Sequence, residues 1–337
     1  MTKVRLGGIK VLAGRSHLTN LCPADESALH DVCRRMAADG INLSFLTHLC
    51  SDHEGNCYTA ACTEIADAYS GYFHWKAGGG SCHVGNPEPD VNILSIFPHN
   101  QNPLIAGTLI QLIARQRTQP RGFASSPSAI SVLIRGADTS KAIDGLFDLF
   151  EFPTHRSPLD WHAAYEGQEH VLKEIICSFQ EDVIKVYDFA RQAGFELWNF
   201  TVSGDGLEQL GKFLTALGKN QARSPFLVGH PDTRNRTHFS ICLPEPSRPF
   251  IEESLSAQPF AEAASCAGSV AVVSLHGPHF GDRFGIVHAL LRSLEQGRIL
   301  PLALCCVVST ISLVVAADEL PDTLRAIETS FQIPHSG

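Results

Sequence analysis

The 337-residue sequence lacks an excess of positive charge. It has 26 lysines and arginines against 35 aspartates and glutamates, a formal net charge of -9 with histidine neutral, and no long basic run. A protein that holds a nucleic-acid backbone needs a basic surface that releases counterions. We therefore predict no nucleic-acid partner.

The sequence also lacks any C-x-x-C pair among its 11 cysteines, and no apolar stretch follows its first five residues. Scattered cysteines without an apolar leader are typical of proteins that stay reduced inside the cell. We therefore predict a cytoplasmic protein without disulfides, in which neighbouring Cys305 and Cys306 are buried, inert thiols.

One uncharged stretch, Ile299 to Ala317, is 19 residues long and has the length of a membrane span. It contains Pro301, however, and polar Ser309, Thr310 and Ser312 lie inside it. Two buried strands joined by a turn give the same composition, because strands covered on both faces read as continuous apolar runs. We predict two strands here and no membrane partner.

The remaining composition, with 44% apolar and 18% charged residues, is that of an ordinary globular protein. An amphipathic helix that runs into a glycine and then an apolar strand is predicted four times, the first helix starting near Asp25. The inward faces and the glycines that follow are Leu29, Val32, Cys33 and Met36 before Gly40; Ile105, Leu109, Leu112 and Ile113 before Gly122; Val183, Val186, Tyr187 and Ala190 before Gly194; and Val287, Leu290, Leu291 and Leu294 before Gly297.

A strand is predicted before each helix, at 9–12, 91–97, 172–179 and 269–275, and further strands and helices follow. The resulting order of strand, helix, strand, strand, helix, strand is that of a ferredoxin-like unit. We predict an α+β protein of four tandem ferredoxin-like (βαββαβ) units in two pairs, in place of a doubly wound nucleotide-binding domain. The units span 1–88, 89–154, 167–266 and 267–337, with a linker at 155–166.

The second and fourth units are similar in sequence. Residues 125–134 align with 306–315, and 150–153 align with 331–334, both with an offset of 331 − 150 = 181 residues. The pattern indicates that the chain is a duplicated pair of units.

Several segments together resemble the ACT-domain family, and more narrowly the tandem regulatory ACT domains of aspartokinases. The second unit carries S-S-P-S-A-I-S-V-L-I (125–134), a predicted helix and F-E-F-P (150–153). The fourth carries V-A-V-V-S-L-H-G (270–277), G-D-R-F-G-I (281–286) and V-S-T-I-S-L-V-V (308–315), and the first carries D-G-I-N-L-S-F-L-T (39–47). The third unit matches only by the order of its elements.

The resemblance implies a small-molecule sensor that binds an amino acid at the loop between the first strand and the first helix, across the interface with a neighbouring unit. It also implies a homodimer formed through ACT-type sheets, and allosteric regulation of a partner enzyme. The sequence shows no kinase domain and no phosphate-binding loop, so we predict neither aspartokinase activity, catalytic residues nor a cofactor.

The candidate ligand-binding residues lie at two such loops. A helix start offers unpaired N–H groups for a carboxylate, arginine binds a carboxylate with two hydrogen bonds, and aspartate binds an ammonium group. The candidates are His276, Gly277, Gly281, Asp282, Arg283, Phe284, Gly285, Ser309 and Thr310 in the fourth unit, and His99, Asn100, Asn102 and Ser128 in the second. The alternative is that Gly281–Gly285 is only a turn in which Asp282 helps to cap the helix, and that Asn100 and Asn102 are only helix caps.

Two other patterns allow different chemistry. His48, Cys50, His53 and Cys57 lie within ten residues and offer nitrogen and sulfur ligands for zinc, although their spacing matches no standard finger. Residues 206–213 nearly match the phosphate-binding-loop motif, but Phe213 stands where the motif needs Ser or Thr. The leucines of this stretch also have helical spacing. An enzyme of unknown class, either a metal-assisted hydrolase or a transferase, and a scaffold that binds no ligand stay open as alternatives.

Overall fold

The protein is a mixed α+β structure built on one large, mainly antiparallel sheet. The computed structural model describes residues 3–24, 29–51, 55–77, 81–165, 184–277, 280, 283–307 and 309–334. Within them no helix is long and apolar enough to cross a membrane.

The order strand, helix, strand, strand, helix occurs four times, and we call these stretches segments 1 to 4. Segment 1 contains β2 (Gly8–Pro23), α1 (Leu29–Ala38), β3 (Phe45–Ser51), β4 (Asn56–Glu64) and α2 (Ala68–Ala77). Segment 2 contains β6 (Glu88–Phe97), α3 (Pro103–Arg115), β7 (Gly122–Ser125), β8 (Ile130–Arg135) and α4 (Thr139–Leu149). Segment 3 contains β11 (Asp188–Ser203), α7 (Gly206–Lys219), β12 (Leu227–Pro231), β13 (Arg236–Pro244) and α8 (Arg248–Ser256). Segment 4 contains β14 (Ala264–His276), α9 (Ile286–Gln296), β15 (Ala303–Val307), β16 (Thr310–Ala316) and α10 (Leu320–Glu328).

Short strands complete the two halves of the chain, the first made of segments 1 and 2 and the second of segments 3 and 4. β1 (Val4–Arg5) pairs in parallel with β9 (Phe150–Glu151), and β10 (Ile184–Lys185) pairs in parallel with β17 (Phe331–Gln332). β5 (His83–Val84) pairs with β2. Between the halves, α5 (Pro158–Tyr165) buries Trp161 against the first half, where its indole Nε1 donates a hydrogen bond to the carbonyl oxygen of Ile9.

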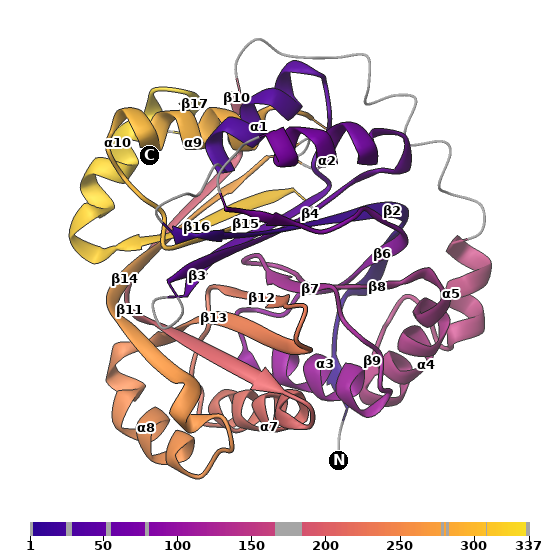
Figure 1. Ribbon diagram of the computed structural model, residues 1–337. Coiled ribbons are helices and arrows are strands. Elements are labelled where there is room, and N and C mark those ends of the chain that lie inside the picture. The colour runs from indigo at the N-terminus through magenta and orange to yellow at the C-terminus, as the bar shows by residue number, and fades with distance from the viewer. Residues whose placement is uncertain are drawn as a thin grey trace.

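The strands form a closed ring. Their order is β4-β3-β15-β16-β14-β11-β13-β12-β7-β8-β6-β2-β5, and a further pairing of β4 with β2 closes the ring, with β5 attached to β2. Segment 4 therefore lies beside segment 1 through β15 and β3, and segment 2 lies beside segment 3 through β7 and β12. In Figure 1 the ring appears as two sheet layers, with α1, α2, α9 and α10 above them, α3, α4, α7 and α8 below, and α5 at their right-hand side.

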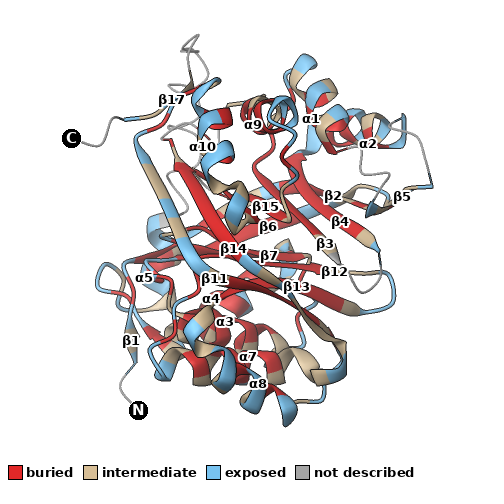
Figure 2. Ribbon diagram, turned by 90° about the vertical axis from the view of Figure 1, so that its left-hand side faces the viewer, coloured by how far each residue is buried: buried red, intermediate tan, exposed pale blue. Residues whose placement is uncertain are grey.

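Burial follows these layers. One apolar cluster, which includes Met36 and Leu290, lies under the upper helices, and a second, which includes Leu109 and Leu214, lies under the lower ones. A third cluster, which includes Phe45, lies between the two sheets. Figure 2 shows buried residues along the strands and the inner helix faces, with exposed residues on the outer faces of the helices.

The described strands and helices of the two halves repeat at a nearly constant spacing. β2 and β11 begin at residues 8 and 188, an offset of 188 − 8 = 180, while β9 and β17 keep the offset of 331 − 150 = 181. Each long strand bends at a glycine with positive φ, Gly14 (65°) and Gly194 (83°), where its pairing register shifts. The sequence indicated the duplication for the second and fourth units, and the spacing of the elements extends it to segments 1 and 3.

Three of the four predicted helices are confirmed with their buried faces, in α1, α3 and α9. Gly40 ends the turn after α1 with a φ of 68°, as predicted for a left-handed cap. Strand formation after it was predicted from Ile41, but β3 starts at Phe45.

The predicted helix before Gly194 is wrong, because residues 188–203 form the strand β11 and Gly194 is its bulge. Alternating side chains, with Leu197 turned to the core between the sheets and Trp198 to the helix side, decide the structure there. The helix of segment 3 is α7, which buries Leu210, Leu214 and Leu217. Val183 and the predicted strand at 172–179 lie outside the described residues.

The uncharged stretch forms the two strands β15 and β16, as predicted, and Cys305 and Cys306 are buried free cysteines. The prediction that disulfides are absent is wrong. Cys22 is bonded to Cys82 and Cys50 is bonded to Cys57. Sequence spacing gave no sign of these bonds because they follow from strand pairing: Cys57 lies opposite Cys50, and the pairing of β2 with β5 brings Cys22 beside Cys82.

Candidate ligand-binding site

Two small pockets lie where neighbouring segments meet. We call them the α1–α9 pocket, between segments 1 and 4, and the α3–α7 pocket, between segments 2 and 3. The first is lined by Cys33, Met36, Ala37, Ile41, Asn42, Leu43, Phe280, Arg283, Gly285, Ile286, Val287, His288 and Cys306. The second is lined by His99, Asn102, Pro103, Ala106, Ser125, Leu214, Ser224 and Leu227. Each has room for about one water molecule.

The pockets occupy equivalent places in the duplicated chain. Ser125 in one and Cys306 in the other are related by the offset of 306 − 125 = 181 residues. In both cases the start of a first helix, α3 or α9, meets a neighbouring segment through its own first helix, α7 or α1. Each pocket therefore lies at a strand-to-helix loop between two segments, the kind of place where the resemblance to ACT domains implied a ligand.

In the α1–α9 pocket, Arg283 and Gly285 are predicted residues that the structure places in the lining. Gly285 caps α9 with a φ of 82°, a conformation that few residues other than glycine adopt easily. Phe280, which sequence reasoning missed, is buried beside them. Its ring lies so close to Gly277 that a Cβ there would be 2.2 Å from it. Gly277 therefore shapes the loop without lining the pocket.

His288 is a second residue that sequence reasoning missed. Its ring stacks on His30 of α1 with centroids 5.2 Å apart, and His30 Nδ1 lies 2.9 Å from Glu295 Oε2. Partial burial, the nearby His30 ring and the positive charges of Arg292 and Arg34 all lower the pKa of His288, while Glu295 opposes the shift. Its Nδ1 has no hydrogen-bond partner among the described residues. The helical positions of His30 and His288 gave no sequence signal, because pairing α1 with α9 is a long-range event.

The other candidates of the fourth unit lie elsewhere or are not described. His276 Nδ1 lies 3.1 Å from Thr310 Oγ1 and 3.2 Å from Ser309 Oγ, on the strand face turned away from the upper helices. These three side chains form a small polar group outside the pocket. Phe284 is partly exposed and also lies outside the lining. Gly281 and Asp282 fall outside the described residues, so their predicted role stays a prediction.

In the α3–α7 pocket, the lining contains predicted His99 and Asn102. Asn102 caps α3, because its side-chain oxygen accepts a hydrogen bond of 2.9 Å from the backbone N–H of Leu104, while its contact with a ligand stays a prediction. His99 Nε2 lies 2.5 Å from the carbonyl oxygen of Ser126. Burial lowers the pKa of His99, and the Ser126 carbonyl partly opposes the shift.

Asn100 and Ser128 have exposed side chains and lie outside this pocket. Asn100 adopts a φ of 50°, which places it in the turn before α3. Ser128 acts through its backbone, since its carbonyl oxygen accepts a hydrogen bond of 3.1 Å from the N–H of His99. Neither residue is therefore placed where it would contact a ligand in the pocket.

The α3–α7 pocket is closed by a tight helix pair. Gln111 Nε2 donates a hydrogen bond of 2.8 Å to Thr215 Oγ1, and Arg115 Nε lies 3.2 Å from Glu208 Oε1. A Cβ on Gly218 would lie 2.5 Å from Asn102 Oδ1, so the end of α7 touches the cap of α3. The phosphate-loop-like stretch 206–213 is part of α7, which confirms that it is helical.

The zinc candidates are partly brought together. His48, Cys50 and Cys57 offer ligand atoms within 4.8 Å of one another, and they are the one such group among the residues that the structure describes. Cys50 and Cys57 are joined as a disulfide, and His53 falls outside the described residues. In this oxidised form the two sulfur atoms are not available as thiolate ligands.

No sequence-family profile and no curated protein sequence matches this chain. Among solved structures, an aspartate kinase from Synechocystis is similar over 97% of this chain, with a TM-score of 0.77 and 15% identity. This chain covers 56% of that kinase. The regulatory subunit of aspartate kinase from Thermus thermophilus, in its ligand-free form, matches 43% of this chain with 17% identity and a TM-score of 0.38. The likeness to the Synechocystis enzyme shows a shared fold over the part of that kinase that this chain covers.

Proposed function

We propose that this protein is a regulatory sensor of the ACT type, which binds a small molecule, most simply an amino acid. Segments 1 to 4 would then be four ACT-like units, paired 1 with 4 and 2 with 3 through their sheets. The observation that carries the proposal is the pair of equivalent pockets, each at a strand-to-helix loop and each shared between two units.

The α1–α9 pocket is the better candidate for a ligand with a carboxylate. Arg283 lies in its lining, and a guanidinium group binds a carboxylate through two parallel hydrogen bonds. The start of α9 adds unpaired backbone N–H groups and a partial positive charge. The unpartnered Nδ1 of His288 adds a further polar group. Among the described residues that line it, the α3–α7 pocket has no arginine or lysine, so we expect it to bind a carboxylate more weakly.

Because each pocket holds about one water molecule, a ligand would have to favour an arrangement in which the paired helices lie further apart. A ligand shifts such an equilibrium only by the difference between its affinities for the two arrangements. Movement of α1 against α9 would then change the outer surface that a partner contacts. The partner, whether a regulated enzyme or a second copy of this chain in a homodimer, is part of the proposal.

Thermal unfolding in the presence of each of the twenty amino acids tests the proposal. A ligand at 100 times its dissociation constant should stabilise the protein by about 2.7 kcal/mol. Arg283→Ala should abolish the shift, while Arg292→Ala, which removes an exposed arginine from the same region of the chain, should retain it. If no amino acid shifts the unfolding transition, the amino-acid sensor is wrong.

The prediction that the chain has no catalytic activity of its own needs a separate measurement, because an aspartate kinase is similar in structure over 97% of this chain. Purified protein would be incubated with ATP, Mg²⁺ and aspartate, and ADP formation would be measured. We expect no formation above the rate without aspartate. Aspartate-dependent ADP formation would favour the enzyme alternative over a purely regulatory role.

A further inference from the structure

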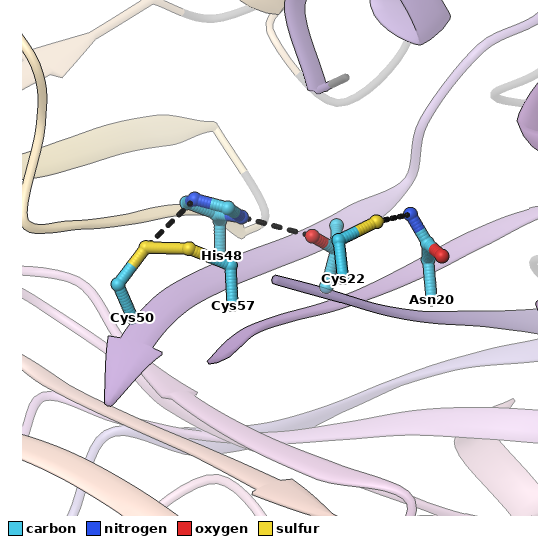
Figure 3. The surroundings of a disulfide bond; sticks show 6 residues. Asn20, Cys22, His48, Cys50 and Cys57 are labelled. Carbon is cyan, nitrogen blue, oxygen red and sulfur yellow. Dashed lines mark hydrogen bonds between the residues drawn. A yellow bond between two sulfur atoms is a disulfide. The ribbon is translucent and has the colours of Figure 1, made fainter. Parts of the chain in front are cut away.

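Three side chains of types that can bind a metal ion share one face of the sheet in segment 1. His48 and Cys50 are two residues apart on β3, so both point to the side covered by the upper helices, and Cys57 lies directly opposite Cys50 on β4. Figure 3 shows the His48 ring beside the Cys50–Cys57 disulfide, with Cys22 and Asn20 on the neighbouring strand.

The distances suit a single metal ion once the disulfide is opened. His48 Nε2 lies 3.5 Å from Cys50 Sγ. Zinc binds sulfur at about 2.3 Å and nitrogen at about 2.0 Å in tetrahedral geometry, which places a nitrogen and a sulfur ligand about 3.5 Å apart. The Cα atoms of Cys50 and Cys57 are 4.1 Å apart, so two thiolates released from the bond remain neighbours.

The surroundings orient the histidine as a ligand. His48 Nδ1 lies 2.8 Å from Thr59 Oγ1, which directs the other ring nitrogen, Nε2, toward the sulfur atoms. A hydrogen bond from the second ring nitrogen is the usual way in which proteins orient a metal-bound histidine. Cys50 is the partly exposed member, whereas His48 and Cys57 are buried, so Cys50 opens the group to solvent.

The other half of the chain shows that the fold does not require these side chains. Thr237 and Phe239 correspond to Cys57 and Thr59 by the offset of 237 − 57 = 180 residues. Their partners across the ladder are Pro231 and Gly229, which stand in the places of Cys50 and His48. The cysteines and the histidine are thus absent from the equivalent positions of segment 3.

We propose that His48, Cys50 and Cys57 form a redox-controlled site for a thiophilic divalent cation such as Zn²⁺. In the reduced state two thiolates and one imidazole bind the ion, and a water molecule occupies the fourth position. In the oxidised state the Cys50–Cys57 bond removes both sulfur ligands and the ion leaves. The site lies apart from both pockets, so it does not depend on the proposed sensor function.

Reduction and oxidation of the site each transfer two electrons. A dithiol reductant donates two electrons and two protons to the disulfide, which yields two cysteine thiols and the reductant's own disulfide. Binding of the divalent cation then releases the two thiol protons. In the reverse direction hydrogen peroxide takes two electrons from the thiolates and two protons from solvent, which forms the Cys50–Cys57 bond and two molecules of water and frees the cation.

Cobalt(II) binding tests the site, because a cobalt–thiolate bond has its own charge-transfer absorption. Full-length protein reduced with a phosphine and freed of the reductant without oxygen would be titrated with Co²⁺ and then with Zn²⁺. We expect one Co²⁺ per chain with thiolate absorption, which Zn²⁺ displaces. Untreated disulfide-bonded protein should show none, and peroxide added to the reduced complex should release the metal.

Variants locate the site. Cys50→Ser and His48→Asn should each weaken Co²⁺ binding at least tenfold, and asparagine keeps a polar group near the position of Nδ1 beside Thr59. Cys266→Ser, which removes another partly exposed cysteine, should bind as the parent does. Circular dichroism would confirm that each variant is folded. The proposal is wrong if reduced parent protein binds no Co²⁺ with thiolate absorption, or if both site variants bind it as tightly as the parent.

Discussion

Gly107 of α3 and Gly211 of α7 face each other so closely that a Cβ on Gly107 would lie 2.4 Å from the carbonyl oxygen of Gly211. The same Cβ would lie 2.7 Å from the backbone nitrogen of Thr215. Two helix backbones are therefore in direct contact between segments 2 and 3. This contact closes the α3–α7 pocket and fixes how the two segments pack.

Gly107→Ala should therefore push α3 and α7 apart. Because the clash is with backbone atoms, which do not move aside as a flexible side chain would, we expect a loss of about 1–3 kcal/mol in the free energy of unfolding. Urea unfolding measures it. Thr108→Ala, one residue along and only partly buried, should change stability by less than about 0.5 kcal/mol. Equal stability of Gly107→Ala and the parent would show that the helices do not pack this closely.

The sequence predicted what depends on local periodicity. The stripe of Ile105, Leu109, Leu112 and Ile113 gave α3 and its buried face, and a similar stripe gave α9. It could not predict which helices pair, because the contact of α3 with α7 and of α1 with α9 arises from segments distant in the chain. Arg283 was predicted as a candidate from its local loop motif. His288, which also lines the pocket, was missed because the pairing of α1 with α9 is a long-range event.

The errors have the same origin. The apolar positions before Gly194 fit a helix as well as a strand over a short window, and only the pairing of β11 with both β13 and β14 decides between them. The disulfides depend on the pairing of β3 with β4 and of β2 with β5, which no spacing of cysteines along the chain reveals.

Acid should destabilise the protein through two buried histidines between the sheets. Burial lowers the pKa of His17 to about 4 and that of His230 to about 3, with Arg121, His17 and His238 adding to the shifts and Glu88 and Asp232 opposing them. In the unfolded chain both side chains have the usual histidine pKa of about 6.5. Between these values the unfolded chain binds more protons, so stability falls as the pH falls from about 6.5 toward 4.

Each of the two histidines should contribute a slope of up to about 1.4 kcal/mol per pH unit in that window. Urea unfolding at several pH values between 7.5 and 4.5 measures the slope. His230→Gln and His17→Gln should each flatten the curve. A histidine on the surface offers the control, and His83→Gln should leave the slope unchanged because His83 is exposed. An unchanged slope in both core variants would contradict this origin of acid sensitivity.

Glu88 should stabilise segment 2 through two arginines. Arg121 donates hydrogen bonds from Nε (2.5 Å) and Nη2 (2.7 Å) to its carboxylate, and Arg135 Nε lies 3.3 Å away. Although burial acts in the opposite direction, these arginines and His17 hold the pKa of Glu88 below its usual value. Because the Arg121 pair is bidentate and partly buried, we expect Glu88→Gln to cost about 1–2 kcal/mol in the free energy of unfolding. The exposed pair of Asp322 and Arg325 is the control, since Asp322→Asn should cost little.

The Cys22–Cys82 disulfide should contribute more to stability than the Cys50–Cys57 disulfide. The first joins cysteines 60 residues apart and the second joins cysteines 7 residues apart, so the first restricts the unfolded chain more. The chain-entropy relation gives about 4 kcal/mol for the longer loop and about 2 kcal/mol for the shorter one.

Urea unfolding of oxidised protein should therefore show a larger loss for the double variant Cys22→Ser with Cys82→Ser than for Cys50→Ser with Cys57→Ser. In reduced protein the difference between the two double variants should largely disappear, because neither bond then constrains the unfolded chain. A difference that persists after reduction would instead assign the loss to packing of the Cys22 side chain in the core.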